Sequence, residues 1–152
     1  MSDHSFVTSL SWTGSTGTGY DVYAREHELA MAGDVVRASS AAAFLGDPFR
    51  PNPEQLLVAA ASSCQLLSFL AVAARARLDV VDYRDEAVGH LLEGDRPMWV
   101  ARIVLRPHIT LGEPAPRAKV ERLIEVAHRE CFIAASLRSE IAIEPVLVGV
   151  AD

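Results

Sequence analysis

The chain has 152 residues, of which 50% are hydrophobic and 22% are charged, and its formal net charge is −6. These values are typical of a folded soluble protein, and the length fits a single domain, residues 1–152, with a sizeable core. Because the pI is near 5.3 and basic residues form no cluster, neither nucleic acid nor membrane is expected as a partner. No basic segment precedes an apolar run at the N-terminus, so no signal peptide is predicted and the expected location is cytoplasmic.

The N-terminal third of the chain predicts three strands. Residues 6–12 alternate between apolar and small polar side chains, which is typical of a strand. The glycine-rich residues 14–19 predict a hairpin connection, because neither a lysine nor a helix start follows as in a phosphate-binding loop. Residues 20–32 predict a second strand and residues 35–39 a short third one. A loop over residues 44–51 then leads into a helix.

That helix, predicted over residues 52–75, is the feature around which the chain is organised. Asn52 suits the N-cap, Pro53 the first helical position, and Glu54 the positive end of the helix dipole. Residues 56–74 contain no glycine, proline or charge. Such a helix is apolar on nearly all sides and must be covered on most of them. Its serine, glutamine and many alanine residues argue against a membrane span.

The C-terminal half predicts two further strands, a second helix and a closing strand. The predicted segments are a strand over 78–92 bent near Gly89, a turn over 94–97, a strand over 98–111, a break over 112–116, a helix over 117–138 with an apolar stripe, and a strand over 141–150. Strands and helices in this order predict an α+β fold. One sheet and one other helix offer too little cover for the apolar helix, so a homodimer with paired central helices is expected.

Two cysteines, Cys64 in the apolar helix and Cys131 in the second helix, are the candidate reactive groups. In a reducing compartment such a pair is either two inert thiols or a redox couple, and residue types alone favour inert thiols. No Cys-x-x-Cys pair occurs and the five histidines are scattered, so no metal site is expected.

Two motifs around these cysteines together resemble the signature of the OsmC/Ohr family of thiol peroxidases. The first is Asn52-Pro-Glu-x-Leu-Leu57 with Cys64 ten residues beyond Glu54, and the second is Ala127-His-x-x-Cys131-Phe-Ile-Ala-x-Ser136. Four shorter pieces resemble one OsmC-like branch: Trp12-x-Gly14, Tyr23-x-Arg25-x-His27, Phe44-x-Gly46-Asp47 and Leu105-Arg-Pro107. The resemblance covers nearly the whole chain.

The resemblance implies an α+β, OsmC-like fold: an intertwined homodimer with two long central helices flanked by antiparallel sheets. It implies reduction of organic hydroperoxides, sometimes also of hydrogen peroxide, without a metal or other cofactor. Cys64 takes the role of the peroxidatic cysteine and Cys131 that of the resolving cysteine, which closes a disulfide. Glu54 and an arginine assist the first thiol. Dithiols, such as lipoyl groups, are the implied reductants.

The assisting arginine is not specified by the motifs. Arg25 is the first choice and Arg50, two residues before the helix, is the alternative. A cation is expected because burial raises the pKa of Cys64, while only the thiolate attacks a peroxide. Ten residues along a straight helix span about 15 Å. The sequence therefore predicts that Glu54 of one subunit serves Cys64 of the other.

Two alternatives to a peroxidase stay open at this point. An OsmC-like dimer whose thiols do not turn over would serve as a small-molecule or lipid-binding protein, and a redox sensor would use the same disulfide as a signal. His128, one turn before Cys131, either eases deprotonation of that thiol or is a packed neutral side chain. Apolar side chains near the cysteines form either a substrate pocket or ordinary core, and they are Leu66, Leu67, Phe69 and Phe132.

Overall fold

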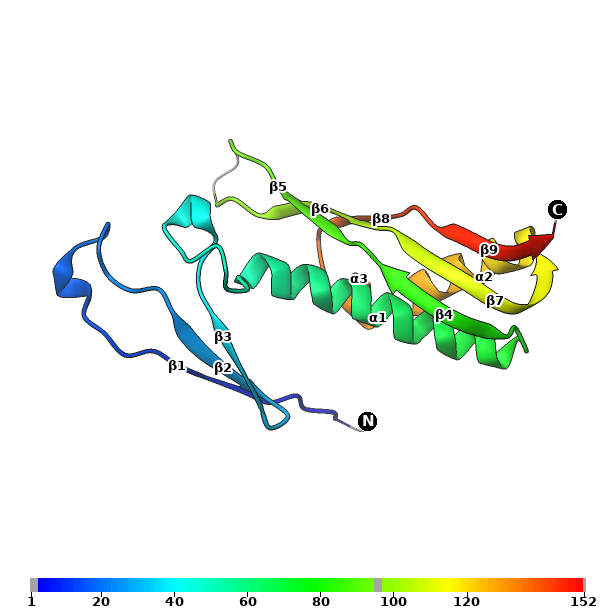
Figure 1. The fold of residues 1–152 in the computed structure, drawn as a ribbon, viewed down its shortest axis with the longest axis horizontal. Coiled ribbons are helices and arrows are strands. Elements are labelled where there is room, and N and C mark those ends of the chain that lie inside the picture. Colours follow the sequence, from blue (N-terminus) through cyan, green and yellow to red (C-terminus); the bar gives the residue numbers. More distant parts are fainter. Residues whose placement is uncertain (1–2, 95–96, 152) are drawn as a thin grey trace. The chain divides into compact units, whose positions relative to one another are not determined.

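The computed structural model describes residues 3–94 and 97–151, and the chain divides into two compact units, residues 1–56 and 57–152 (Figure 1). The first unit contains an antiparallel sheet in the order β1-β2-β3. Its elements are β1 (Thr8–Ser11), the short 3₁₀ helices η1 (Thr16–Thr18) and η2 (Ala42–Phe44), β2 (His27–Met31) and β3 (Asp34–Ala38).

The predicted strand over residues 20–32 is confirmed only for its second half, β2, since residues 20–26 form a turn and an irregular segment. The backbone N–H groups of Val22 and Tyr23 both donate to the carbonyl of Gly19. The Arg25 side chain then donates to two carbonyls of the same segment. These local hydrogen bonds use backbone groups that a strand would pair with a neighbour.

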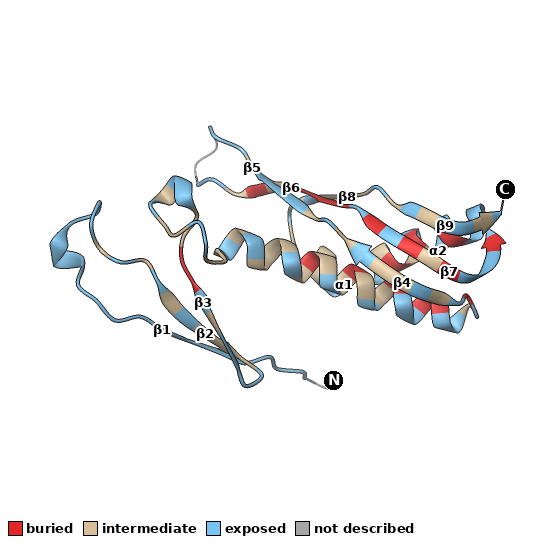
Figure 2. Cartoon of the chain, viewed as in Figure 1, coloured by how far each residue is buried: buried red, intermediate tan, exposed pale blue. Residues whose placement is uncertain are grey.

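Helix α1 (Pro53–Arg75) has the predicted bounds. Its start is a reciprocal cap, in which the Asn52 side chain accepts from the Gln55 N–H at 2.9 Å and the Gln55 side chain accepts from the Asn52 N–H at 3.0 Å. Past its end, Arg77 adopts a left-handed conformation with φ of 53°. The buried side chains of α1 lie on one stripe: Ala61, Gln65, Phe69, Val72 and Ala73. Its other sides are partly or fully exposed in the single chain (Figure 2).

The second unit contains two mixed three-stranded sheets, with orders β4-β7-β9 and β5-β6-β8. Their strands are β4 (Val80–Asp85), β5 (Val88–Leu91), β6 (Val100–Leu105), β7 (Pro107–Pro116), β8 (Glu140–Ile143) and β9 (Val146–Ala151). The pairs β6–β8 and β7–β9 are parallel and the others antiparallel, so the expectation of antiparallel sheets holds only in part.

Each of the three long strands predicted in this half is divided into two, and each crosses from one sheet to the other at the division. Hydrogen bonds join the three crossing points. Asp85 accepts from the Arg106 N–H at 2.6 Å, the Arg106 guanidinium donates to Glu144 at 3.0 Å, and the Glu144 N–H donates to the Leu105 carbonyl at 2.8 Å. Gly89 lies inside β5, where an added Cβ would be 2.5 Å from Val58 of α1. The pairing of β5 with β6 is irregular between His90 and Leu91, next to the position where the bend was predicted.

The remaining predictions for this half are confirmed or corrected as follows. Residues 112–116 do not break the strand but complete β7. The helix predicted over 117–138 is divided at Cys131 into α2 (Arg117–Glu130) and α3 (Phe132–Ser136), because Cys131 has extended backbone angles, φ −74° and ψ 110°. The turn predicted over 94–97 includes residues 95–96, which lie outside the described residues.

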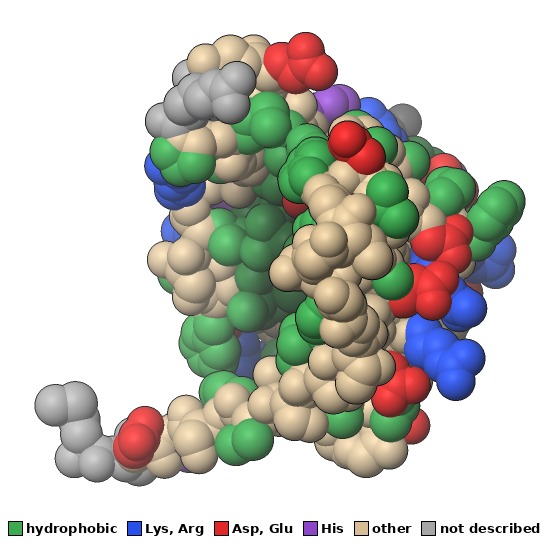
Figure 3. Space-filling view, turned by 90° about the vertical axis from the view of Figure 1, so that its left-hand side faces the viewer, with side chains coloured by type: hydrophobic (Ala, Val, Ile, Leu, Met, Phe, Trp, Pro, Cys, Tyr) green, Lys and Arg blue, Asp and Glu red, His purple; other side chains and the backbone are tan. Residues whose placement is uncertain are grey.

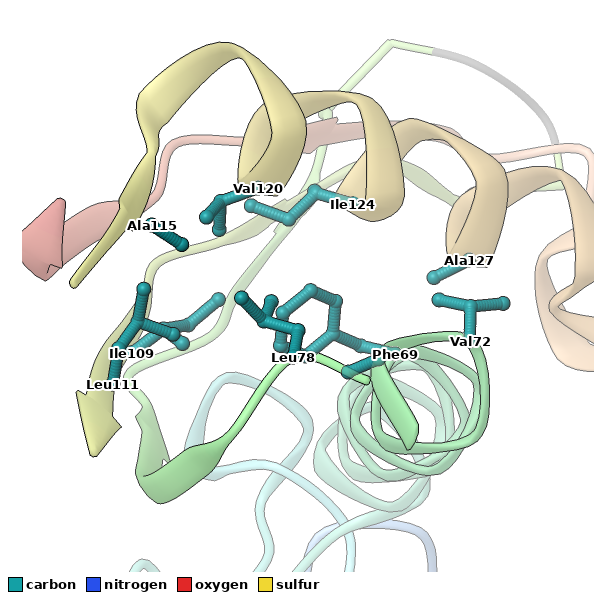
Figure 4. Close-up of a cluster of buried hydrophobic side chains, with 10 residues drawn as sticks. Phe69, Val72, Leu78, Ile109, Leu111, Ala115, Val120, Ile124 and Ala127 are labelled. Atoms are coloured by element: carbon teal, nitrogen blue, oxygen red, sulfur yellow. The ribbon is translucent and has the colours of Figure 1, made fainter. Parts of the chain in front are cut away.

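The larger hydrophobic cluster of the second unit lies between α1, α2 and the sheet (Figure 4). Phe69 and Val72 of α1 face Ile124 and Ala127 of α2 across it. Its labelled side chains from the sheet and the loop after α1 are Leu78, Ile109, Leu111 and Ala115. A smaller cluster contains Ala61, Val100, Ile103 and Leu105.

Hydrophobic side chains also reach the surface in several places in the view of Figure 3. Helix α1 is long and apolar enough to cross a membrane by length and composition, and 33% of its most apolar stretch is buried within the single chain. Because its buried stripe packs into both hydrophobic clusters, α1 is a core helix of a soluble fold.

Candidate active site

Cys64 and Cys131 come together in the second unit. Cys64 lies in the middle of α1, and Cys131 is at the junction where α2 ends and α3 begins. Both thiols are free, Cys64 is half-buried and Cys131 is 2% exposed. The side chains are in hydrogen-bond contact, with the Cys131 thiol donating to the Cys64 sulfur. The fold thus pairs the two candidate residues.

The pKa of the Cys64 thiol lies below its ordinary value, although burial alone raises it. Hydrogen bonds to the sulfur outweigh burial: they come from the Cys131 thiol, the backbone N–H of Ile133, the Ser68 hydroxyl and the backbone N–H of Phe132. None of these four donors carries a charge. The unit therefore favours the Cys64 thiolate through a thiol, a hydroxyl and the first amides of α3.

The pKa of Cys131 is shifted in the opposite direction. Burial raises the pKa of this thiol, and the contact with Cys64 raises it further, because a proton on Cys131 is needed for the donated hydrogen bond. The backbone N–H of Ala134 donates to the Cys131 sulfur at 3.4 Å and opposes these effects. When one of the two thiols loses its proton, the negative charge is thus favoured on Cys64 and the remaining proton on Cys131.

Arg25, the first choice for the assisting cation, lies in the first unit. Its guanidinium donates to the carbonyls of Tyr20 at 2.7 Å and Tyr23 at 3.0 Å. It also stacks over both rings, 5.1 Å from the centroid of Tyr20 and 4.0 Å from that of Tyr23. The alternative, Arg50, forms an ion pair with Asp47 at 3.7 Å. Arg25 is the more firmly held of the two cations.

Arg25 lines a cavity of about 420 Å³ that lies within residues 1–56. The lining residues are Leu10, Trp12, Thr16, Tyr23, Arg25, His27, Ser39, Ser40 and Pro53. Trp12 is fixed there by a hydrogen bond from its indole N–H to the Ala24 carbonyl at 2.8 Å. The cavity therefore has aromatic walls, and one guanidinium supplies its positive charge.

Glu54 is in the first turn of α1, and one of its carboxylate oxygens, Oε2, is buried with no hydrogen-bond partner among the described residues. Cys64 lies ten residues further along the same unbroken helix, a rise of about 15 Å. A buried carboxylate oxygen without a donor is costly. The structure thus leaves Glu54 with an unused acceptor and separates it from the Cys64 of its own helix.

Two residues beside the thiols were missed from the sequence. Ser68 is four residues after Cys64, so its hydroxyl lies on the same side of α1, and this spacing is a usable signal. Gln65 is 1% exposed, and its amide N–H donates to the Ile124 carbonyl of α2 at 3.4 Å, while its Oε1 has no partner among the described residues. Nothing in the sequence indicates that contact, because it depends on how α1 packs against α2.

Metal-binding capacity is limited in the described part of the chain: no group of three or more His, Cys, Asp or Glu side chains there is placed to hold an ion. The chemistry that the paired thiols support is nucleophilic attack by one sulfur followed by disulfide formation with the other. Both steps use groups that the second unit itself supplies.

Comparisons with known proteins identify relatives of the whole chain and of its fold. An uncharacterized protein of Bacillus subtilis (strain 168), YmaD, is 23% identical over 148 residues, covering 95% of this chain and 93% of its own length. The solved structure of an OsmC-like protein of unknown function from Vibrio cholerae O1 biovar eltor is 31% identical, covers 96% of this chain and 100% of its own, and superposes with a TM-score of 0.83.

A second solved structure, an organic hydroperoxide resistance protein from Elizabethkingia anophelis, has the same fold at 16% identity. It superposes with a TM-score of 0.67 and covers 97% of this chain and 98% of its own. The profile of the family described as OsmC-like protein matches residues 46–146, which include both cysteines. The chain therefore belongs to the OsmC-like protein family.

Proposed function

We propose that the protein is a thiol peroxidase that reduces organic hydroperoxides, with Cys64 as the attacking thiol and Cys131 as the resolving thiol. The observation that carries this proposal is the contact between two free thiols whose pKa values are shifted in opposite directions. Membership of a family that includes organic hydroperoxide resistance proteins supports it.

The first step is attack by the Cys64 thiolate on one oxygen of the peroxide bond. The sulfur gains that oxygen as a sulfenic acid, the O–O bond breaks, and the alcohol leaves after taking up a proton. Cys131 then attacks the sulfenic sulfur, which forms the disulfide and releases water. A dithiol donor, of the lipoyl type, reduces the disulfide by two thiol–disulfide exchanges and is itself oxidised.

The lowered pKa supports the attacking role proposed for Cys64, since attack requires the thiolate. Cys64 is also the more exposed of the two residues: it is half-buried, whereas Cys131 is 2% exposed. Apolar side chains near the thiols remain exposed in the single chain, including Leu67 at 63% and Phe132 at 82%. Such surroundings suit a peroxide with an apolar chain. Phe69, by contrast, belongs to the core.

A homodimer completes this site in the proposal. The apolar helix α1 is covered on one stripe only within a single chain, and a second copy is the simplest cover for the rest. Glu54 of one subunit then serves Cys64 of the other and holds an arginine, with Arg25 the first candidate and Arg50 the second. An arginine there would stabilise the thiolate further and bind the peroxide oxygen. We place this enzyme in the cytoplasm, where dithiol donors are reduced.

The proposal is tested by peroxide consumption with dihydrolipoamide as the donor and cumene hydroperoxide or hydrogen peroxide as the substrate. Cys64→Ser is expected to abolish turnover. Cys131→Ser is expected to stop after one equivalent of peroxide, with a sulfenic acid that dimedone traps on Cys64. Faster turnover of cumene hydroperoxide than of hydrogen peroxide would support the apolar substrate class.

Full peroxidase activity in Cys64→Ser would exclude Cys64 as the attacking thiol. Formation of the Cys64–Cys131 disulfide without repeated turnover by any dithiol would identify a redox sensor instead. Binding of apolar ligands by a protein that consumes no peroxide would identify a binding protein.

A further inference from the structure

His128 is a titratable residue that the proposed reaction does not yet use. It lies in the last turn of α2, three residues before Cys131, and its backbone carbonyl accepts a hydrogen bond from the Cys131 N–H at 3.3 Å. Its ring nitrogen Nδ1 is buried and has no hydrogen-bond partner among the described residues. An unsatisfied nitrogen of this kind is uncommon in a folded protein and calls for an explanation.

Cys131 needs a proton acceptor when it attacks. It is 2% exposed, so bulk water has little access to the thiol, and its proton is held by the hydrogen bond to Cys64. Burial raises the pKa of Cys131. Only its thiolate is a good nucleophile, so resolution of an oxidised Cys64 would be slow without a base nearby.

The spacing brings His128 and Cys131 to neighbouring positions on one side of the chain. Side chains three residues apart in a helix have Cβ atoms about 5–6 Å from each other. A neutral imidazole with its proton on Nε2 offers Nδ1 as an acceptor. Catalytic hydrogen bonds are often longer in a resting structure than in the reacting one, so a hydrogen bond between Nδ1 and the Cys131 thiol is not required before the reaction starts.

We propose that His128 accepts the proton of the Cys131 thiol as this sulfur attacks an oxidised Cys64. In the step, a bond forms between the two sulfurs, the bond from the Cys64 sulfur to its leaving group breaks, and the proton passes from the Cys131 sulfur to Nδ1. With a sulfenic acid the imidazolium then returns this proton to the departing hydroxide, which leaves as water. This role of His128 adds a proton acceptor to the proposed peroxidase cycle, on which it rests. The same proton transfer applies to any leaving group on the Cys64 sulfur.

Helix α2 packs against α1, α3, β7 and β9. These elements, residues 57–75 of α1 and the last two turns of α2 carry several titratable side chains in addition to His128. They are Cys64, Arg75, His108, Glu113, Glu125, Arg129 and Glu130. Arg75 is paired with Glu130 at 2.8 Å, and the other side chains of β7 and α2 in this list are exposed. Tyr83 of β4 packs against the same hydrophobic cluster as α2, and its hydroxyl is also buried with no partner among the described residues. Of the groups on residues 57–75 of α1 and on α3, β7 and β9, together with Cys131 itself, the two thiols are the ones that are neither exposed nor ion-paired.

The experiment uses a disulfide reagent, 5,5′-dithiobis(2-nitrobenzoate), and no peroxide, so it does not depend on peroxidase activity. Cys64 of the reduced protein attacks the reagent and releases one thionitrobenzoate, and Cys131 then displaces a second from Cys64. Two phases of yellow colour are expected for the unmodified protein and one for Cys131→Ser. In His128→Asn the first phase should keep its rate, while the second slows by about 100-fold, which is typical of loss of a general base.

The control variant is His108→Asn, which replaces an exposed histidine on β7 and should leave both phases unchanged. In the unmodified protein the second phase should change little between about pH 7 and pH 9, because the acceptor of the thiol proton is part of the site. In His128→Asn it should rise about tenfold per pH unit across the same range, since the thiol alone then titrates. His128→Gln is expected to behave like His128→Asn.

An unchanged second phase in both His128 variants would overturn the proposal. So would a second phase in the unmodified protein that rises tenfold per pH unit to pH 9, a measurement that requires no variant to fold. These results are distinct from failure of the peroxidase itself, which would appear as absent peroxide consumption with two normal phases of reagent release.

Discussion

The two units of the chain differ in how well they bury their own apolar side chains. In the second unit, residues 57–152, α1, α2 and two sheets enclose two hydrophobic clusters. Among the described residues 3–56 of the first unit, only Ala38 and Ser39 are buried. Apolar side chains there are strongly exposed, with Phe6 at 93% and Phe49 at 92%.

This difference indicates that the second unit forms its core by itself, whereas the first does not. A three-stranded sheet is stable only when one of its faces is packed against something. Exposed apolar side chains in such numbers mark a surface that another molecule or segment covers. The thiol pair lies in the unit that forms its own core, and Arg25 lies in the unit whose apolar side chains are largely exposed.

The largest expected effect comes from Phe69→Ala in the second unit. Phe69 is fully buried and packs against Tyr83 with ring centroids 6.0 Å apart. The substitution should lower the free energy of unfolding by about 3–5 kcal/mol, since it removes a large buried side chain and leaves a cavity. Urea denaturation measures this change.

The matched substitution in the first unit is Leu10→Ala, at a β1 position that is 63% exposed. It should change the free energy of unfolding by less than about 0.5 kcal/mol if nothing covers β1. A larger loss of unfolding free energy, increasing with protein concentration, would show instead that a second copy of the chain covers β1. Equal losses for both substitutions would contradict the contrast between the units.

The second prediction concerns the association of two copies of the chain into a dimer. Leu67→Glu places a charge on the exposed side of α1, where Leu67 is 63% exposed in the single chain. If paired α1 helices form the dimer, this charge should weaken association by at least about tenfold, because a buried unpaired charge is costly. Sedimentation velocity at several concentrations measures the dissociation constant.

Val35→Glu in β3 is the comparison, since Val35 is 61% exposed in the first unit. It should leave the dissociation constant unchanged if the dimer is formed by α1 alone. Dissociation by Val35→Glu and not by Leu67→Glu would move the interface to the N-terminal sheet.

The smallest expected effect tests whether groups of the second unit are sufficient to lower the pKa of Cys64. Ser68→Ala removes one hydrogen bond to the sulfur, so the pKa of Cys64 should rise. At a pH below that pKa less thiolate is present, and alkylation by iodoacetamide should slow several-fold near pH 7, with the difference vanishing above the pKa. Asp34→Asn, an exposed change in β3, is the control and should have no effect. An unchanged rate profile in Ser68→Ala would remove the serine from the site.

Several features of the site were predictable from the sequence. The bounds of α1 followed from its cap residues and from the absence of glycine and proline, which are local properties. The pairing of Cys64 with Cys131 was expected only from the family resemblance, because the distance between two cysteines depends on packing. The contact of Gln65 with the Ile124 carbonyl had no signal at all, since it joins two helices far apart in the chain.

The divided strands were missed for a related reason. Residues 78–92, 98–111 and 141–150 were each predicted as one strand, because a strand pattern does not record which sheet a strand joins. The divisions depend on the hydrogen bonds among Asp85, Arg106 and Glu144, which come from three separate segments. The break at Cys131 likewise interrupts an apolar stripe that continues past it.

By itself, the sequence determined the bounds of α1, the positions of most other helices and strands, and which two residues are able to carry sulfur chemistry, because propensity, periodicity and residue type act locally. Only the tertiary structure decided that Cys131 donates to Cys64, that the pKa of Cys64 is lowered, and that Nδ1 of His128 is buried with no partner among the described residues. Such properties arise when groups distant in the chain exclude water together and share hydrogen bonds, and they exist only once the chain has packed.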